Sequence, residues 1–143
     1  MNADLREETR AEWRQLGFYY ERDDVRKEWL LVGSRGGLQR FSQLLSDYAA
    51  DPRHDRLSEH EHYGPYLYLE VMTSVEAGVD AHSIHGPLPS IGALARLVEA
   101  KIHAMQPGAR APIGELFAPS AAYALVLDLR EDGFDPASLD SGL

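Results

Sequence analysis

The polar side chains of this chain are densest in one run, Glu59-His60-Glu61-His62-Tyr63. On an extended backbone alternate residues point to the same side, so the two histidines of the run would share one side, as two imidazole ligands of a metal ion must. Two further histidines follow on a predicted neighbouring strand and loop. The candidate metal ligands are therefore His60, His62, His82 and His85. Together with Glu59 or Asp80 they could surround a zinc or nickel ion, although the spacing specifies no third ligand.

Solvated loop histidines are the alternative interpretation, because a chain with six histidines produces a His-x-His pair by chance. Catalysis without a metal would need a nucleophile or a base that is held by a third group. The serines and threonines near histidines are only loosely spaced from them, and neither a nucleophile elbow nor a His-Glu-x-x-His helix is present. Acid–base chemistry by Glu59 or Glu61 with His62 stays open as a hydrolase alternative.

Tyrosines gather beside the same run, at Tyr63, Tyr66 and Tyr68. Tyrosine is an amphipathic side chain that is favoured at protein interfaces. Because acidic residues lie close in sequence, we expect an acidic, tyrosine-rich sheet face that binds a partner. Ordinary packing of this face under a helix or loop is the alternative. The predicted recognition surface consists of Glu59, His60, Glu61, His62, Tyr63, Tyr66 and Tyr68.

A glycine-rich segment, Gly33-Ser34-Arg35-Gly36-Gly37, lies between a predicted strand and a predicted helix. Backbone amides at such a place can hold a phosphate. The segment lacks the Lys-Ser/Thr of a P-loop and the spacing of a dinucleotide fingerprint. We therefore expect a strand-to-helix turn whose glycines need a positive φ.

The charge of the chain bears on its partners. Its 143 residues include 14 basic and 23 acidic side chains, for a net charge of −9. A field of that sign repels phosphate backbones, which disfavours a nucleic-acid-binding protein. It would attract a basic protein partner, although many cytosolic proteins are acidic merely for solubility. The absence of cysteine excludes disulfides, thiolate metal sites, iron–sulfur clusters and cysteine nucleophiles.

The length predicts one domain over residues 1–143, with a core large enough to fold without disulfides. The first twenty residues are charged and hold no apolar stretch, so they do not form a signal peptide. No later apolar run is long enough to cross a bilayer. We therefore predict a cytoplasmic protein that does not associate with membranes. Residues 131–143 contain four acidic and no basic residues, and we expect a tail or a loosely docked turn there.

Hydrophobic periodicity predicts the elements that must position the candidate residues. The predicted helices span residues 3–15, 38–50 and 90–105, the last with Ser90 as its N-cap. The predicted strands span residues 18–20, 29–32, 65–72, 81–85 and 122–129, and residues 52–63 are expected to be an exposed loop. In the strand from Pro65, alternation places Leu67, Leu69 and Val71 on the core face and the tyrosines on the other.

Paired strands that are followed by a helix predict an α+β fold. We expect a two-layer arrangement: a mostly antiparallel sheet of about five strands, with two to three helices packed on one face.

The run His60-Glu61-His62-Tyr63-Gly64-Pro65-Tyr66-Leu67-Tyr68-Leu69, followed by Gly86-Pro87-Leu88 and a helix from Ile91, resembles small bacterial domains grouped among the immunity proteins of polymorphic-toxin systems. The resemblance covers the middle third of the chain. It implies a cytosolic, non-enzymatic protein that neutralises a cognate toxin by binding it. Many toxins of this kind are basic nucleases, with which the acidity and the tyrosines are compatible. The expected partner is thus a protein, and the resemblance implies more specifically that this protein is a basic toxin.

Three functions stay open from the sequence, and we rank them in this order. The first is a binding or immunity module that uses the predicted recognition surface. The second is a metal-dependent or acid–base hydrolase that uses the four histidines, which requires a concave, shielded pocket around them. The third is a structural or self-associating protein whose exposed strand edge pairs between chains.

Overall fold

A computed structural model describes residues 2–143 of the chain. The helices of this part are α1 (Ala3–Leu16), α2 (Arg35–Ala50) and α3 (Leu88–Ala104). The strands are β1 (Tyr19–Asp23), β2 (Glu28–Ser34), β3 (His60–Tyr63), β4 (Leu69–Thr73), β5 (Gly78–Val79), β6 (Ile84–Gly86), β7 (Arg110–Pro112) and β8 (Ala124–Arg130). Three 3-10 turns complete the described chain, namely η1 (Pro52–His54), η2 (Pro65–Leu67) and η3 (Pro136–Leu139).

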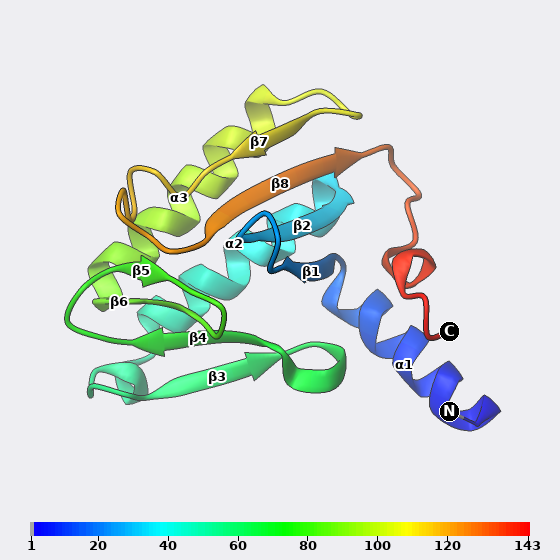
Figure 1. Cartoon of the computed structure of the whole chain (residues 1–143), viewed down its shortest axis with the longest axis horizontal. Helices are drawn as coiled ribbons and strands as arrows, with labels where there is room; N and C mark the ends of the chain where they lie inside the picture. Colours follow the sequence, from blue (N-terminus) through cyan, green and yellow to red (C-terminus); the bar gives the residue numbers. More distant parts are fainter. Residues whose placement is uncertain (1) are drawn as a thin grey trace.

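Within residues 2–143 the strands form two four-stranded sheets, in the orders β1-β2-β8-β7 and β3-β4-β6-β5. Each sheet has a parallel pair at its centre, β2 with β8 and β4 with β6, and an antiparallel strand at each edge. In Figure 1 the first sheet lies above the second, and α2 and α3 pass behind them. The α+β class is confirmed and antiparallel pairs are in the majority. The single sheet of about five strands is wrong, because local alternation does not reveal which distant strands pair.

The helices α2 and α3 pack against each other, and α2 also packs against β2 and β8. The apolar stripes predicted for them are buried, at Leu38, Phe41, Leu45, Tyr48, Ile91, Leu94, Ala95, Val98 and Ile102. At the start of α2, Arg35 donates hydrogen bonds to the carbonyl oxygens of Ile102 and Met105. A cation is favourable there, because the last carbonyls of a helix lack partners within it. α3 begins at Leu88, before the predicted Ser90 cap, since proline is tolerated in a first helical turn.

Three strands, β3, β5 and β7, lie outside the strands that the sequence predicts. β3 is polar and exposed for most of its length, so it carries no apolar alternation that would reveal it. β7 contains Pro112, which is tolerated because β7 is an edge strand with one side free of ladder hydrogen bonds. All three missed strands are edges of their sheets. β5 is buried but only two residues long, too short to show an alternation. The strand predicted over residues 81–85 is found as β6, at Ile84–Gly86.

The acidic segment 131–143 packs onto α1 at the end of the molecule where both termini lie (Figure 1). Asp135 forms an ion pair with Arg14, with 3.0 Å between the carboxylate Oδ2 and the guanidinium Nη2. Ala137 is buried. The segment is therefore a docked turn and not a free tail. The sequence of the segment does not reveal this basic partner, because Arg14 lies 121 residues earlier in the chain than Asp135.

The glycines of the β2–α2 junction do not serve the purpose that the sequence predicts. Gly33, Gly36 and Gly37 all lie outside the left-handed region of φ. Gly37 is instead required by close approach, because a Cβ atom there would lie 2.2 Å from the carbonyl oxygen of Gly17. A Cβ atom at Gly36 would meet nothing within 4 Å. The helix α2 thus begins in direct contact with the turn that ends α1.

We expect Gly37→Ala to lower the free energy of unfolding by about 1–3 kcal/mol, because the methyl group collides with backbone and forces the two elements apart. Gly36→Ala is the matched control on the same helix turn. It should be neutral or stabilising by up to about 1 kcal/mol, because alanine is the better helix former. Urea denaturation of both variants measures the difference, and equal stability of the two would contradict the steric explanation.

Candidate functional site

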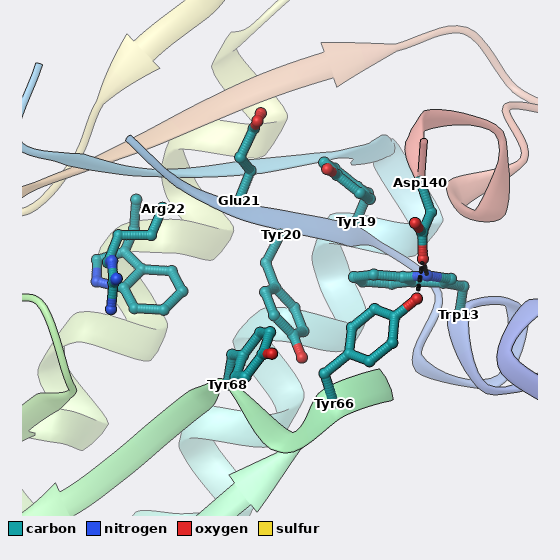
Figure 2. A pocket seen from close by; sticks show the side chains of 9 residues that line it. Trp13, Tyr19, Tyr20, Glu21, Arg22, Tyr66, Tyr68 and Asp140 are labelled. Carbon is teal, nitrogen blue, oxygen red and sulfur yellow. Dashed lines mark hydrogen bonds between the residues drawn. The ribbon is translucent and has the colours of Figure 1, made fainter. Parts of the chain in front are cut away.

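A pocket of about 510 Å³ opens between β1 of the first sheet and the loop that joins β3 to β4 of the second (Figure 2). Its volume falls in the range of small-ligand sites, roughly 300–1,000 Å³. Six of the nine lining residues are aromatic, namely Trp13, Tyr19, Tyr20, Trp29, Tyr66 and Tyr68. They come from α1, β1, β2 and the loop before β4, so the pocket depends on the packing of distant segments.

Tyr20 forms the floor that joins the two sheets. Its side chain is buried, and its hydroxyl hydrogen is shared between the carbonyl oxygens of Tyr63, at 3.1 Å, and of Pro65. Burial raises the pKa of the Tyr20 phenol to about 12. The backbone amides of Tyr68 and Leu69 act to lower this pKa, but burial has the larger effect. The loop backbone therefore curls around one neutral hydroxyl group.

The conformation of this loop strains its backbone. Gly64, Tyr66 and Leu67 have φ values of 75°, 65° and 56°. Positive φ is natural for glycine but costs roughly 1–3 kcal/mol at other residues, and such strain persists only where the surroundings hold it. The strand predicted from Pro65 accordingly starts only at Leu69. Leu67, predicted for the core, is 60% exposed.

Asp140 holds the end of the pocket together. Its Oδ2 atom accepts hydrogen bonds from the Trp13 indole at 2.8 Å and from the Tyr66 hydroxyl at 2.7 Å, as Figure 2 shows. Its Oδ1 atom accepts from the amide of Gly142 at 2.9 Å. Burial acts to raise the pKa of the Asp140 carboxyl, but these hydrogen bonds outweigh it and the pKa is lowered. One carboxylate thus links α1, the strained loop and the C-terminal turn.

The hydroxyl of Tyr66 and the guanidinium of Arg22 lie at opposite ends of the pocket. Burial, the hydrogen bond to Asp140 and the charge of Asp140 raise the pKa of the Tyr66 phenol to about 12, so this hydroxyl stays protonated near pH 7. Arg22, at the other end, forms an ion pair with Asp24 at 2.8 Å and donates to the carbonyl oxygen of Ala81. The aromatic rings and the acidic side chains that line the pocket can hold a cation.

The predicted recognition surface is divided by the pleat of β3 and β4. His60 and His62 pair with Met72 and Glu70 on one face of the sheet. Glu61 and Tyr63 occupy the opposite face, with the buried residues of β4. Glu59 is exposed just before β3. Of the seven predicted residues, only Tyr66 and Tyr68 line the pocket.

The four predicted metal ligands do not converge. His60, His62 and the unpredicted Glu70 form one group, in which one ligand atom of each lies within 4.8 Å of the others. His85 lies two strands away from His60 in the sheet, because both pair with Met72 from opposite sides. The imidazole of His85 covers Gly78 on β5, and His82 lies in the turn before β6. Among the described residues, the group that could hold an ion thus contains two of the four predicted histidines.

The sequence predicts an exposed loop over residues 52–63, yet the side chain of His54 is buried. Its ring stacks on Tyr48 with 3.8 Å between ring centroids, and its Nδ1 lies 2.8 Å from the Tyr48 carbonyl oxygen. Its Nε2 lies 3.2 Å from the Glu61 carboxylate. Burial acts to lower the pKa of His54, but these acceptors outweigh it and the pKa is raised. His54 therefore anchors β3 under the end of α2.

Sequence reasoning missed most of the pocket. The unpredicted lining residues are Trp13, Tyr19, Tyr20, Glu21, Arg22, Trp29 and Asp140. The only local signal was the aromatic richness of the first hairpin, which strand propensity alone also explains. No helix in the described part of the chain combines the length and the apolar character that crossing a membrane would require.

Removing the Tyr20 hydroxyl should release the strained loop. We expect Tyr20→Phe to lower the free energy of unfolding by about 1–3 kcal/mol, because buried carbonyl groups lose their donor. The control is Tyr19→Phe, since the Tyr19 ring contacts Trp13 and no hydrogen bond of its hydroxyl is found among residues 2–143. Chemical denaturation compares the two, and a loss for Tyr19→Phe as large as for Tyr20→Phe would refute this role.

The lowered pKa of Asp140 predicts an acid-sensitive contact. Its stabilising contribution is complete above the unfolded value of about 3.9 and is lost as the pH falls through the lower folded value. We expect Asp140→Asn to cost about 1–3 kcal/mol at pH 7 and to flatten the fall in stability below pH 4. Asp132→Asn, an exposed change in the same segment, is the control. Unfolding curves between pH 2.5 and 7 measure both, and parallel curves for wild type and Asp140→Asn would disprove the assignment.

Comparisons of the chain with protein-family models, with curated proteins and with solved structures find no match.

Proposed function

We propose that this protein is a non-enzymatic binding protein whose aromatic pocket takes up a basic side chain of a protein partner. The observation that carries the proposal is the convergence of six aromatic side chains and the Asp140 carboxylate on one open cavity. A cation over aromatic faces is stabilised by about 0.5–2 kcal/mol, more where water is displaced. The hydrogen-bonded carboxylate of Asp140 adds a fixed negative charge at one end.

Arginine fits this pocket better than lysine does. Its planar guanidinium stacks on aromatic rings and presents several donors to a carboxylate. Tyr66 and Tyr68 stack on each other with 5.7 Å between ring centroids, and Tyr68 is 67% exposed at the mouth. Exposed tyrosines at the rim of a pocket are typical anchors of a protein interface.

The charge of the whole chain favours the same kind of partner. A net charge of −9 accelerates the encounter with a basic protein and disfavours nucleic acid. In its specific form the proposal is an immunity role, in which the partner is a basic toxin that is neutralised in the cytoplasm. The resemblance around residues 60–69 and the acidity support this form.

The hydrolase alternative is less well supported. It needs a shielded pocket around the histidines. His60 and His62 are instead exposed on an edge strand, and the pKa values of the Tyr20 and Tyr66 phenols are raised.

Both tryptophans of the chain line the pocket, so tryptophan fluorescence reports directly on its occupancy. We expect an arginine-containing peptide to change the emission in a saturable way, and the same peptide with citrulline to bind at least about 2- to 30-fold more weakly, because citrulline keeps the shape and lacks the charge. Tyr68→Ala should weaken binding of the arginine peptide by a similar factor.

Leu116→Ala is the matched control, because Leu116 is another highly exposed large side chain and does not line this pocket. It should leave both titrations unchanged. Equal binding of the arginine and citrulline peptides, or an unaltered affinity in Tyr68→Ala, would count against the proposed cation site.

A further inference from the structure

A second cluster of functional groups lies outside the aromatic pocket, on the exposed face of β3 and β4. His60 and His62 are alternate residues of β3, and their rings meet edge to face with 5.2 Å between centroids. Glu70 of β4 is the direct cross-strand partner of His62. One ligand atom from each of the three side chains lies within 4.8 Å of the other two.

Hydrogen bonds to the main chain orient both imidazoles. The Nδ1 atom of His60 lies 2.9 Å from the carbonyl oxygen of Ser58, and the Nδ1 atom of His62 lies 3.1 Å from that of Leu67. A carbonyl oxygen can only accept, so in each neutral ring the hydrogen is on Nδ1 and the lone pair is on Nε2. Histidines that bind metals have this arrangement, in which the second nitrogen donates to a carbonyl or carboxylate.

We infer that His60, His62 and Glu70 form a binding site for a divalent transition-metal ion, with zinc as the preferred class. Two imidazoles and one carboxylate are a known ligand set for zinc with one coordination position left to water. The bond lengths of about 2.0–2.2 Å place ligand atoms of a tetrahedral ion roughly 3.3 Å apart. Small rotations of these side chains close the difference from 4.8 Å, because both histidines are exposed and Glu70 is only half-buried.

The other histidines provide internal comparisons. His103 lies on α3, and its Nε2 is 2.8 Å from the carboxylate of Glu99 one turn away, an ordinary helix pair. The Nδ1 of His85 lies 2.9 Å from the hydroxyl of Ser83. Neither belongs to a group of three ligand side chains among the residues that the structure describes. Removal of either histidine should therefore leave metal binding intact.

The test is a calorimetric titration of the untagged, chelator-treated full chain with zinc, and separately with nickel, at pH 7.5, where imidazoles are neutral ligands. We expect one ion per chain with a Kd of about 1 μM or tighter, and a rise of the melting temperature with zinc. His60→Ala and His62→Ala should each weaken binding at least 10- to 100-fold, the loss typical of groups that only orient a ligand. Glu70→Gln should weaken binding about 10-fold.

His103→Ala should bind zinc as the wild type does, and circular dichroism should show every variant to be folded, since the altered histidines are solvent-exposed. The inference is overturned if the wild type binds no zinc, if His62→Ala retains wild-type affinity, or if His103→Ala loses as much affinity as the site variants. An unchanged affinity in Glu70→Gln overturns the assignment of the third ligand. None of these outcomes depends on the aromatic pocket, so the inference stands or falls independently of the proposed function.

Discussion

The phenol of Tyr20 is one of the points at which the two sheets are joined, and the one on which the pocket loop depends. It belongs to the edge strand of the first sheet, and its hydroxyl lies inside the loop that connects two strands of the second. A buried hydroxyl needs partners, and a loop with residues at positive φ needs something to hold it. The loop carbonyl oxygens are the partners of the Tyr20 hydroxyl, and the hydroxyl in turn holds the loop in place. The wall of the aromatic pocket therefore depends on a contact between residues more than forty positions apart.

The C-terminal turn closes the same structure from the outside. Asp140 could not accept from Trp13 and Tyr66 together unless α1 and the strained loop were already side by side. The ion pair between Arg14 and Asp135 is largely exposed and contributes little by itself. The hydrogen bonds to a partly buried carboxylate are the stronger contribution. The aromatic pocket is thus assembled by polar contacts at its rim as much as by apolar packing beneath it.

Sequence reasoning succeeded where burial imposes a period. The stripes of α2 and α3, the first hairpin, and the core positions Leu69 and Val71 follow from spacing alone. It failed where distant segments decide the structure. The curl at Tyr66 and Leu67 arises from the Tyr20 hydroxyl, and the parallel pairing of β2 with β8 joins strands from opposite ends of the chain. Neither leaves a local pattern.

The candidate sites show the same limit. The spacing of His60 and His62 places them on one face in any strand, so their proximity was predictable. The third member, Glu70, is found only through the register of β3 against β4, which the sequence did not reveal because β3 has no apolar face. For the aromatic pocket, the sequence indicates the two loop tyrosines, Tyr66 and Tyr68, as binding residues. It does not indicate Trp13 and Asp140, because these two meet only through tertiary packing.

The loop of residues 64–68 takes part in both sites. Its Tyr66 and Tyr68 side chains line the aromatic pocket, and its Leu67 carbonyl oxygen receives the hydrogen bond that orients His62. The loop is strained, so its conformation is held by these contacts and not by local preference. A metal ion bound at His62, as we propose, would strengthen the contact to Leu67, and a partner side chain in the pocket would contact Tyr66 and Tyr68. Because both would favour the same loop conformation, each would lose less conformational entropy with the other present, and their coupling would be positive.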